Sequence, residues 1–537
     1  MSMRAARRAS DLSATPSSDP PTFPSPDALD SDLERQAAKL DHVSSSVSPS
    51  TSDQKPDKDE SVSSPEPAKP PQTTLAPEDS SNPRNWSLPK KFLCNTILCI
   101  WVLSLTYAST AYVASLGAIE QRYHLGQEAS ILGVSLTVLG FAAGPLLFGP
   151  SSELFGRRPV YVFCGIGFSA FAWGSAFANN AAALLIFRFL LGFFGSASIN
   201  NVPASIGDTT YPRERGQFNA IYSVGAFLGP ALGPLCSSFI ESDAGYEWNF
   251  RVMAIFATVT SIGAALVPET HGPTLYRRQL AKIAREKEGF ELERTPLGAK
   301  VSTVVGVYKG ALKRPFIFFF TEPIVLFVSI YLSILYGILY GFFEAFGLVY
   351  VETRGFSRTS YGLTYVALGL GFIVAATMIA TLGSRAYVKQ VEKAKLTGEP
   401  APAEARLVLG YAAAIVSPIS LFLFAWTAPF PHVHWIVPCL AEFLFSLSMQ
   451  LIFVSFISYL IDVYTLHAAS ALAAGMASRA LVGGIFPLFA IQMYRALTIQ
   501  GATSLLAGLA LLCTPLPFIF RKVGKGLRLK SKYAQSS

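Results

Sequence analysis

The chain has 537 residues, of which 51% are hydrophobic and only 15% are charged. This composition lies outside the range of ordinary soluble domains, so it excludes a soluble globular enzyme and predicts a membrane protein. The formal net charge is +8, and it does not require a nucleic acid partner because most basic residues lie on one side of the apolar segments, as the topology of a membrane protein alone explains.

The first segment, residues 1–84, is rich in Ser, Pro and Asp and contains no apolar run. Such a composition cannot bury a hydrophobic core, and it lacks the apolar region of a secretory signal. We therefore predict a disordered cytosolic N-terminal tail. Its serines are candidates for phosphorylation, and a solvated tail without a specific role is an equal alternative.

Twelve apolar segments follow the tail, each long enough to cross a hydrocarbon core of about 30 Å as a helix. Lipid requires each backbone polar group to be satisfied within its own segment, and the segments lack the short alternation of barrel strands, so helices are predicted. The predicted helices cover about 91–117, 130–149, 159–178, 182–204, 217–240, 250–268, 318–346, 361–383, 407–427, 434–460, 468–492 and 503–520.

The positions of Lys and Arg predict the orientation of these helices. About 28 of these residues lie on the side of the chain termini and only about five on the other side, which places both termini in the cytoplasm. We predict an N-terminal six-helix half (85–268), a cytoplasmic linker (269–317), a C-terminal six-helix half (318–520) and a basic cytosolic tail (521–537). This plan is typical of a transporter built from two similar halves.

A charged loop marked by glycines joins the second and third predicted helices. It reads FGPSSELFGRRPV and contains Gly149, Glu153, Gly156, Arg157 and Arg158. We expect Gly149 to allow close helix packing, Glu153 to lie at the positive N-terminal end of the third helix, and the two arginines to hold the loop in the cytoplasm. Charges that pair when an inner gate shuts would form a latch. A simple positively charged turn explains the arginines but not the glycine spacing.

The fourth predicted helix contains a charge, Arg188, four residues before Gly192. A charged side chain at this depth is costly and faces the bundle interior or a cavity. Arg188 is therefore a candidate for proton coupling or for the substrate cavity. Pairing with backbone carbonyls is the structural alternative.

The fifth predicted helix carries a regular glycine and proline pattern, SVGAFLGPALGP, with Gly225, Gly229, Pro230, Gly233 and Pro234. A spacing of four places the glycines on one helix face, where two backbones can approach closely. The prolines are expected to bend that face. Ordinary packing of small residues is the alternative interpretation.

Two carboxylates in the second half are candidate proton carriers: Glu344 late in the seventh helix and Glu442 in the outer half of the tenth. A carboxylate buried in apolar surroundings can take up a proton near neutral pH. For Glu344 the alternative is an ion pair with Arg354 or Arg358, and for Glu442 it is a structural hydrogen bond. Asp462, at the inner end of the tenth helix, is better suited to a gate or a helix cap.

These motifs resemble those of the major facilitator superfamily. Residues 149–158 resemble its signature G-x-x-x-D-x-x-G-R, with Glu153 where the acid is usually Asp, and the fifth helix resembles the pattern associated with its antiporters. Arg188 and Gly192 resemble an R-x-x-x-G element to which a role in proton transfer is ascribed. The fragments NPRNW, PET and AASALAA look like those of fungal twelve-helix drug:proton antiporters, and the resemblance covers about 82–525.

The resemblance implies an all-α membrane protein with twelve transmembrane helices in two six-helix halves. It also implies a proton-coupled efflux transporter of the plasma membrane that exports amphipathic organic compounds, drugs or secondary metabolites, by alternating access. We expect a monomer that is not an enzyme and that needs no cofactor or metal, since the proton gradient supplies the energy. Proton-coupled uptake and a non-transporting membrane sensor are the alternatives.

Overall fold

The computed structural model describes residues 79, 81–211, 214–286, 297–397, 402–464 and 467–534. Within these ranges every regular element is a helix. Almost all of the predicted N-terminal tail, residues 1–78 and 80, lies outside the described residues, as does part of the linker, residues 287–296.

The first half of the bundle consists of six membrane-length segments preceded by the short helix η2 (Pro83–Asn85). They are formed by α2 (Leu88–Thr110) with η3 (Ala111–Ser115) and α3 (Leu116–Tyr123), α4 (Gln127–Phe155), α5 (Arg157–Ala176), α6 (Ala181–Gly195) with α7 (Ala197–Thr209), α8 (Arg215–Ala244) and α9 (Tyr246–Leu266). Two linker helices, α10 (Gly272–Glu286) and α11 (Leu297–Thr321), follow.

The second half repeats this plan. Its segments are formed by α12 (Pro323–Phe346) with η4 (Gly347–Thr353), α13 (Arg358–Met378) with η5 (Ile379–Gly383) and α14 (Ser384–Thr397), η6 (Ala403–Leu407) with α15 (Val408–Ala425), α16 (Ile436–Val463), α17 (Ala468–Cys513) and α18 (Leu516–Lys530).

The described ranges contain eleven helical segments that are long and apolar enough to cross a membrane. The last of them, Ser470–Lys530, has 61 residues, which is about three times the length that one span needs. Within it, Thr498 has non-helical dihedral angles, with φ 63° and ψ 166°. The segment therefore turns at Thr498 and crosses twice, which confirms the twelve predicted helices.

The last span extends further than predicted. The apolar pattern ends at about residue 520, whereas α18 continues to Lys530. Arg528 near its end is buried and forms an ion pair with Glu404 of η6. Because this carboxylate balances the charge, the helix can continue into the basic stretch 521–537 for which the sequence predicts a tail.

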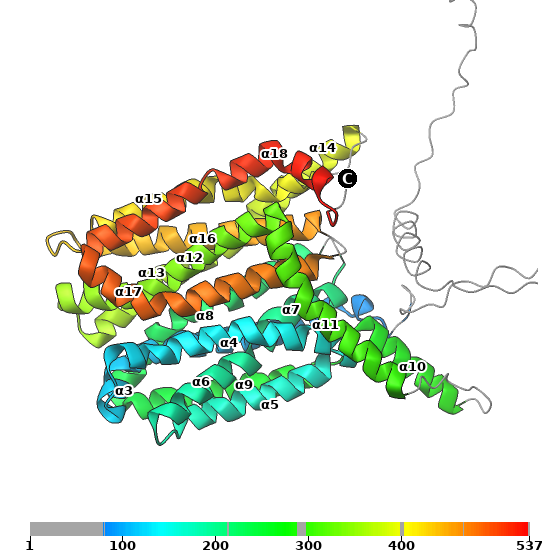
Figure 1. Cartoon of the computed structure of the whole chain (residues 1–537), viewed down its shortest axis with the longest axis horizontal. Coiled ribbons are helices and arrows are strands. Elements are labelled where there is room, and N and C mark those ends of the chain that lie inside the picture. The colour runs from blue at the N-terminus through cyan, green and yellow to red at the C-terminus, as the bar shows by residue number, and fades with distance from the viewer. Residues whose placement is uncertain are drawn as a thin grey trace, which may run out of the picture. The chain divides into compact units, whose positions relative to one another are not determined.

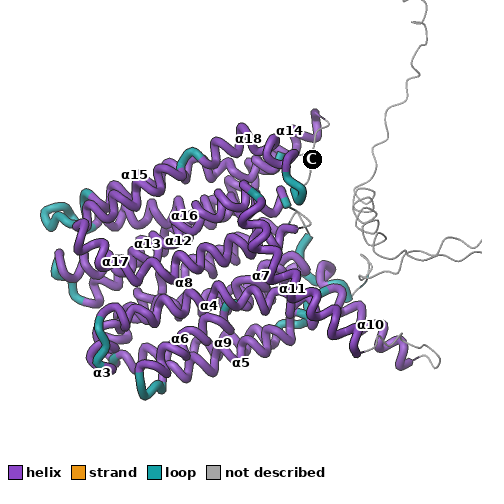
Figure 2. Tube along the Cα trace, viewed as in Figure 1, coloured by secondary structure: helices purple, strands orange, loops and turns teal. Residues whose placement is uncertain are grey.

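The helices run alongside one another, and their connecting loops gather at two ends of the bundle (Figures 1 and 2). One end carries α10, α14 and the C-terminus, and we call it the linker face; α3 lies at the other end, the opposite face. The halves meet through α4 with α17 and α8 with α13. The contact is close, because a Cβ atom at Gly484 would lie 2.8 Å from Leu139, and one at Gly362 would lie 2.6 Å from Ser238.

Candidate functional site

Arg157 of the charged loop is buried and joins three helices at the linker face. Its Nε atom donates to Oδ2 of Asp208 on α7 at 3.1 Å, and its guanidinium also donates to the Ser152 hydroxyl on α4. Burial, followed by the positive charge of Arg157, lowers the pKa of the nearby His271. His271 therefore adds no positive charge near neutral pH, and Arg157 with Asp208 forms the ionic centre of this region.

The acid at the N-terminus of α5 is Glu269, and the prediction that Glu153 would take this place was wrong. Glu269 accepts hydrogen bonds from the backbone N–H groups of Arg157 at 2.8 Å and Arg158 at 3.2 Å. Gly156 makes this approach possible, since its φ is +100° and a Cβ atom there would lie 2.5 Å from a Glu269 oxygen. The positive end of a helix favours such a carboxylate, and here it comes from the loop after α9.

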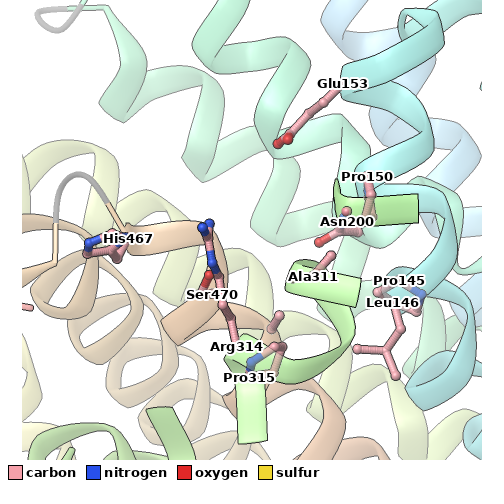
Figure 3. A pocket seen from close by; sticks show the side chains of 14 residues that line it. Pro145, Leu146, Pro150, Glu153, Asn200, Ala311, Arg314, Pro315, His467 and Ser470 are labelled. Atoms are coloured by element: carbon pink, nitrogen blue, oxygen red, sulfur yellow. The ribbon is translucent and has the colours of Figure 1, made fainter. Parts of the chain in front are cut away.

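Glu153 instead lines a cavity of about 620 Å³ at the linker face, together with Asn200, Arg314 and His467 (Figure 3). Glu153 lies on α4 and Arg314 on α11, the second linker helix. Neither side chain forms an ion pair with a described residue. Gly149 lies on the same wall, where a Cβ atom would be 2.8 Å from the Asn200 amide nitrogen. Gly149 and Glu153 of the motif therefore face the linker helix α11 across the cavity. Arg157 and Arg158 instead contact other residues of the N-terminal half.

The three glycines of the fifth-helix motif all face α2. A Cβ atom at Gly225 would lie 2.5 Å from the Cys99 carbonyl oxygen, and one at Gly229 would lie 1.9 Å from the Thr106 hydroxyl. A Cβ atom at Gly233 would likewise lie 2.2 Å from the Thr110 hydroxyl oxygen. Pro230 and Pro234 are buried within α8, which remains one helix from Arg215 to Ala244. The motif therefore allows α8 and α2 to pack backbone against backbone.

Arg188 is fully buried and donates hydrogen bonds to three backbone carbonyls. Its acceptors are Gly133 on α4 at 3.0 Å and two carbonyls near the end of α2, Ala108 at 2.9 Å and Ser109 at 3.3 Å. The α-helix α2 ends at Thr110, and the last carbonyls of a helix lack partners within it. Arg188 supplies donors to them and so ties α6 to α2 and α4.

Glu442 is a fully buried carboxyl group on α16 with one neighbouring hydroxyl. The Tyr350 hydroxyl of η4 donates to its Oε1 atom at 2.6 Å. The other oxygen, Oε2, is buried and has no hydrogen-bond partner among the described residues. Arg188 and Glu442, the two candidates for proton coupling on α6 and α16, have separate sets of partners, and the structure does not bring them into contact.

Glu344 is buried near the end of α12, and the proposed ion pairs with Arg354 or Arg358 do not form. Arg354 donates to four loop carbonyls, among them those of Ala428 and Val433. Arg358 pairs with Glu241 of α8 at 2.6 Å. Both guanidinium groups are therefore used elsewhere.

Asp462, at the linker end of α16, forms an ion pair with Arg406 of η6 at 2.8 Å. This contact ties the end of α16 to the start of the α15 segment. It is compatible with the predicted role in a gate.

Three charged residues that the structure draws attention to were not selected from the sequence. Asp208 lies at the end of a predicted span, Glu269 lies in the PET fragment, and Arg479 lies inside the predicted eleventh helix. A signal was present for Arg479, because a charge within an apolar span is unusual. No sequence pattern indicated that Asp208 and Glu269 would bind Arg157, because these two acids lie 51 and 112 positions after it in the chain.

The contacts at the linker face predict different effects for two of its acids, Asp208 and Glu153. Asp208→Asn leaves the charge of buried Arg157 without its carboxylate, which we expect to cost about 2 kcal/mol of unfolding free energy. Glu153→Gln removes a carboxylate without an ionic partner and should leave stability unchanged. Thermal unfolding of the purified full-length variants in detergent tests this difference, and equal midpoints for the two variants would contradict the assignment.

Comparison with known proteins gives concordant results. A family model described as Major Facilitator Superfamily matches residues 96–487. The efflux pump FUB11 of Gibberella moniliformis is 38% identical over 459 residues, which are 85% of this chain and 77% of that protein. The major facilitator superfamily multidrug transporter mdrA of Aspergillus fumigatus is 37% identical over 460 residues, 86% of this chain and 75% of that protein.

Among solved structures, the proton:xylose symporter XylE bound to 6-bromo-6-deoxy-D-glucose matches with a TM-score of 0.59 at 15% identity. The match covers 81% of this chain and 96% of that one. At this level of identity the similarity shows the fold alone.

Proposed function

Because the chain belongs to the major facilitator superfamily, and within it to the family of these fungal transporters, we propose that it is an efflux transporter. It exports small amphipathic organic compounds, drugs or secondary metabolites, by alternating access in exchange for protons. The similarity to efflux and multidrug transporters over 85% or more of the chain carries this proposal. The proton gradient supplies the energy, and the transporter works in the plasma membrane as a monomer without a cofactor.

The positions of the cavity and of the polar contacts between the halves support an alternating-access cycle. The cavity of about 620 Å³ lies at the linker face. At the opposite face the halves are bridged by the Arg358–Glu241 ion pair and by a hydrogen bond from Gln492 to Glu128 at 2.6 Å. We propose that the linker face, which carries most basic loops, is cytoplasmic, and that this conformation accepts substrate from the cell interior.

In the proposed cycle the residues of the charged loop have two different roles. Gly149, Gly156, Arg157 and Arg158 belong to the gate at the linker face, where the Arg157–Asp208 pair keeps the first half rigid. Glu153 lies in the cavity wall and is the motif acid that can meet the linker or the second half when the cavity closes.

The proposed proton carrier is Glu442, whose only hydrogen bond to a described residue comes from Tyr350. The membrane interior penalises a charge without a counter-ion, so proton uptake and release is the change this side chain can make. Glu344 is the second candidate. Arg188 is better suited to holding the helices in place, because its donors are directed at backbone carbonyls.

The direction and the coupling are tested in inside-out vesicles from a host that expresses the full chain. With an acidic lumen, we expect the vesicles to accumulate a labelled substrate, 2-naphthoate, and to discharge the pH gradient as they do so. Vesicles without the protein are the control. Accumulation only under the reversed gradient would favour uptake by symport, and binding without movement under either gradient would favour a sensor.

A further inference from the structure

Arg479 is a charged residue in the middle of the membrane that the proposed cycle does not use. It follows Ala468, the first residue of α17, by eleven positions, which places it about 16 Å along the helix. Its guanidinium carbon lies 5.6 Å from the centre of the Phe453 ring on α16. The centre of the Phe453 ring lies in turn 5.2 Å from that of Phe227 and 6.2 Å from that of Tyr336.

These neighbours place Arg479 between the two halves of the transporter. Phe227 belongs to α8 in the first half, whereas Tyr336 and Phe453 belong to α12 and α16 in the second. Arg479 and Tyr336 are half-buried at this depth, although Phe453 and Phe227 are buried. Because side chains of both halves meet at the ring that the guanidinium faces, we infer that its accessible part faces the space between the halves and not the lipid.

Arg479 differs from the other arginines of the spans in how its charge is balanced. Arg188 donates to three carbonyls, and Arg157 pairs with Asp208. For Arg479, by contrast, the described part of the chain provides a π-face at Phe453 but neither a hydrogen-bond acceptor nor a carboxylate. A guanidinium without a counter-ion is costly in the membrane interior. The resting transporter therefore holds an unbalanced positive charge beside aromatic rings.

We propose that Arg479 recognises an anionic group on the cargo, so that the substrate class is an amphipathic organic anion such as an aromatic carboxylate. The planar guanidinium can bind a carboxylate through two parallel hydrogen bonds. The apolar body of the same molecule then packs against the rings of Phe453 and Tyr336. This inference deepens the proposed efflux function and rests on it, since it concerns the central substrate site of that cycle.

The test compares three probes that share one ring system and differ in charge. 2-Naphthoate is negative, 2-naphthylmethylamine is positive and 2-naphthylmethanol is neutral near pH 7. Their binding to the purified full-length protein in lipid nanodiscs is measured without any gradient. We expect naphthoate to bind roughly 10- to 100-fold more tightly than the amine, and Arg479→Gln to remove this preference. Arg479→Lys keeps the charge but not the planar guanidinium, and it should retain part of the preference for naphthoate.

Arg495→Gln is the matched control, because Arg495 lies on the same helix in a groove at the opposite face. The Arg495→Gln variant should bind all three probes as the unmodified protein does. Retained binding of the neutral alcohol by Arg479→Gln shows that the site is still folded. Any of four results would overturn the inference. The unmodified protein could prefer the amine, bind the three probes equally or fail to bind naphthoate, or Arg479→Gln could bind naphthoate as tightly as the unmodified protein does. Anion-selective binding without gradient-driven accumulation would instead count against the export function alone.

Discussion

Glu442→Gln is expected to abolish proton-driven export while leaving substrate binding intact. Glutamine preserves the size of the side chain and can still accept the hydrogen bond from Tyr350, which the carboxyl oxygen now receives at 2.6 Å. It cannot release or take up a proton, so the step that couples the gradient to the conformational change is lost. Accumulation of labelled substrate in acid-loaded inside-out vesicles should fall to the level of vesicles without the protein.

Two further measurements separate a coupling defect from a folding defect. Exchange of labelled for unlabelled substrate across the vesicle membrane needs no net proton movement, so Glu442→Gln should still perform it. Tyr350→Phe removes the hydroxyl but keeps the ring and the carboxyl group, and it should shift the pH dependence of export without abolishing it. If Glu442→Gln pumps normally with an unchanged pH profile, Glu442 is structural, and Glu344→Gln becomes the variant to test for loss of coupling.

The helical plan could be predicted because lipid imposes it locally. A backbone that must satisfy its own hydrogen bonds leaves an apolar run of about 20 residues few alternatives to a helix. The glycine face of α8 could be predicted for the same reason, since a spacing of four fixes which residues share a helix face. The helix ends were less well predicted; the last helix continues to Lys530, because the charge of Arg528 is balanced by Glu404, which is distant in sequence.

The partners of the charged residues could not be predicted because they depend on how distant segments pack. Glu153 lies four residues before Arg157 and appeared to be the natural acid for α5, yet the carboxylate bound there belongs to Glu269, 112 positions away. Arg188 does pair with backbone carbonyls, the alternative named from the sequence, but every residue type carries a carbonyl, so the sequence does not show which ones. A sequence can therefore show that a buried charge needs a partner without showing which group supplies it.

Gly229→Ala is expected to reduce transport strongly and to lower the thermal stability of the protein. A Cβ atom at this position would lie 1.9 Å from the Thr106 hydroxyl oxygen and 2.8 Å from the backbone nitrogen of Tyr107. A hydroxyl can rotate away, but the α2 backbone cannot move without displacing its helix. We expect α8 to be pushed away from α2 at a cost of about 1–3 kcal/mol, measured by thermal unfolding of the purified protein alongside vesicle transport.

Two other glycines separate this packing effect from the general effect of adding a methyl group to a helix. Gly508 lies in the last span with no atom within 4 Å of its virtual Cβ, so Gly508→Ala should be neutral or slightly stabilising. At Gly149 the only close group is the amide end of Asn200, a side chain that can rotate, so Gly149→Ala should have an intermediate effect. Gly149→Leu fills more of the cavity wall and should reach the membrane but transport poorly. If Gly229→Ala instead behaves like Gly508→Ala in both stability and transport, the α8 glycines are not required for close packing against α2, and the fifth-helix motif must act in another way.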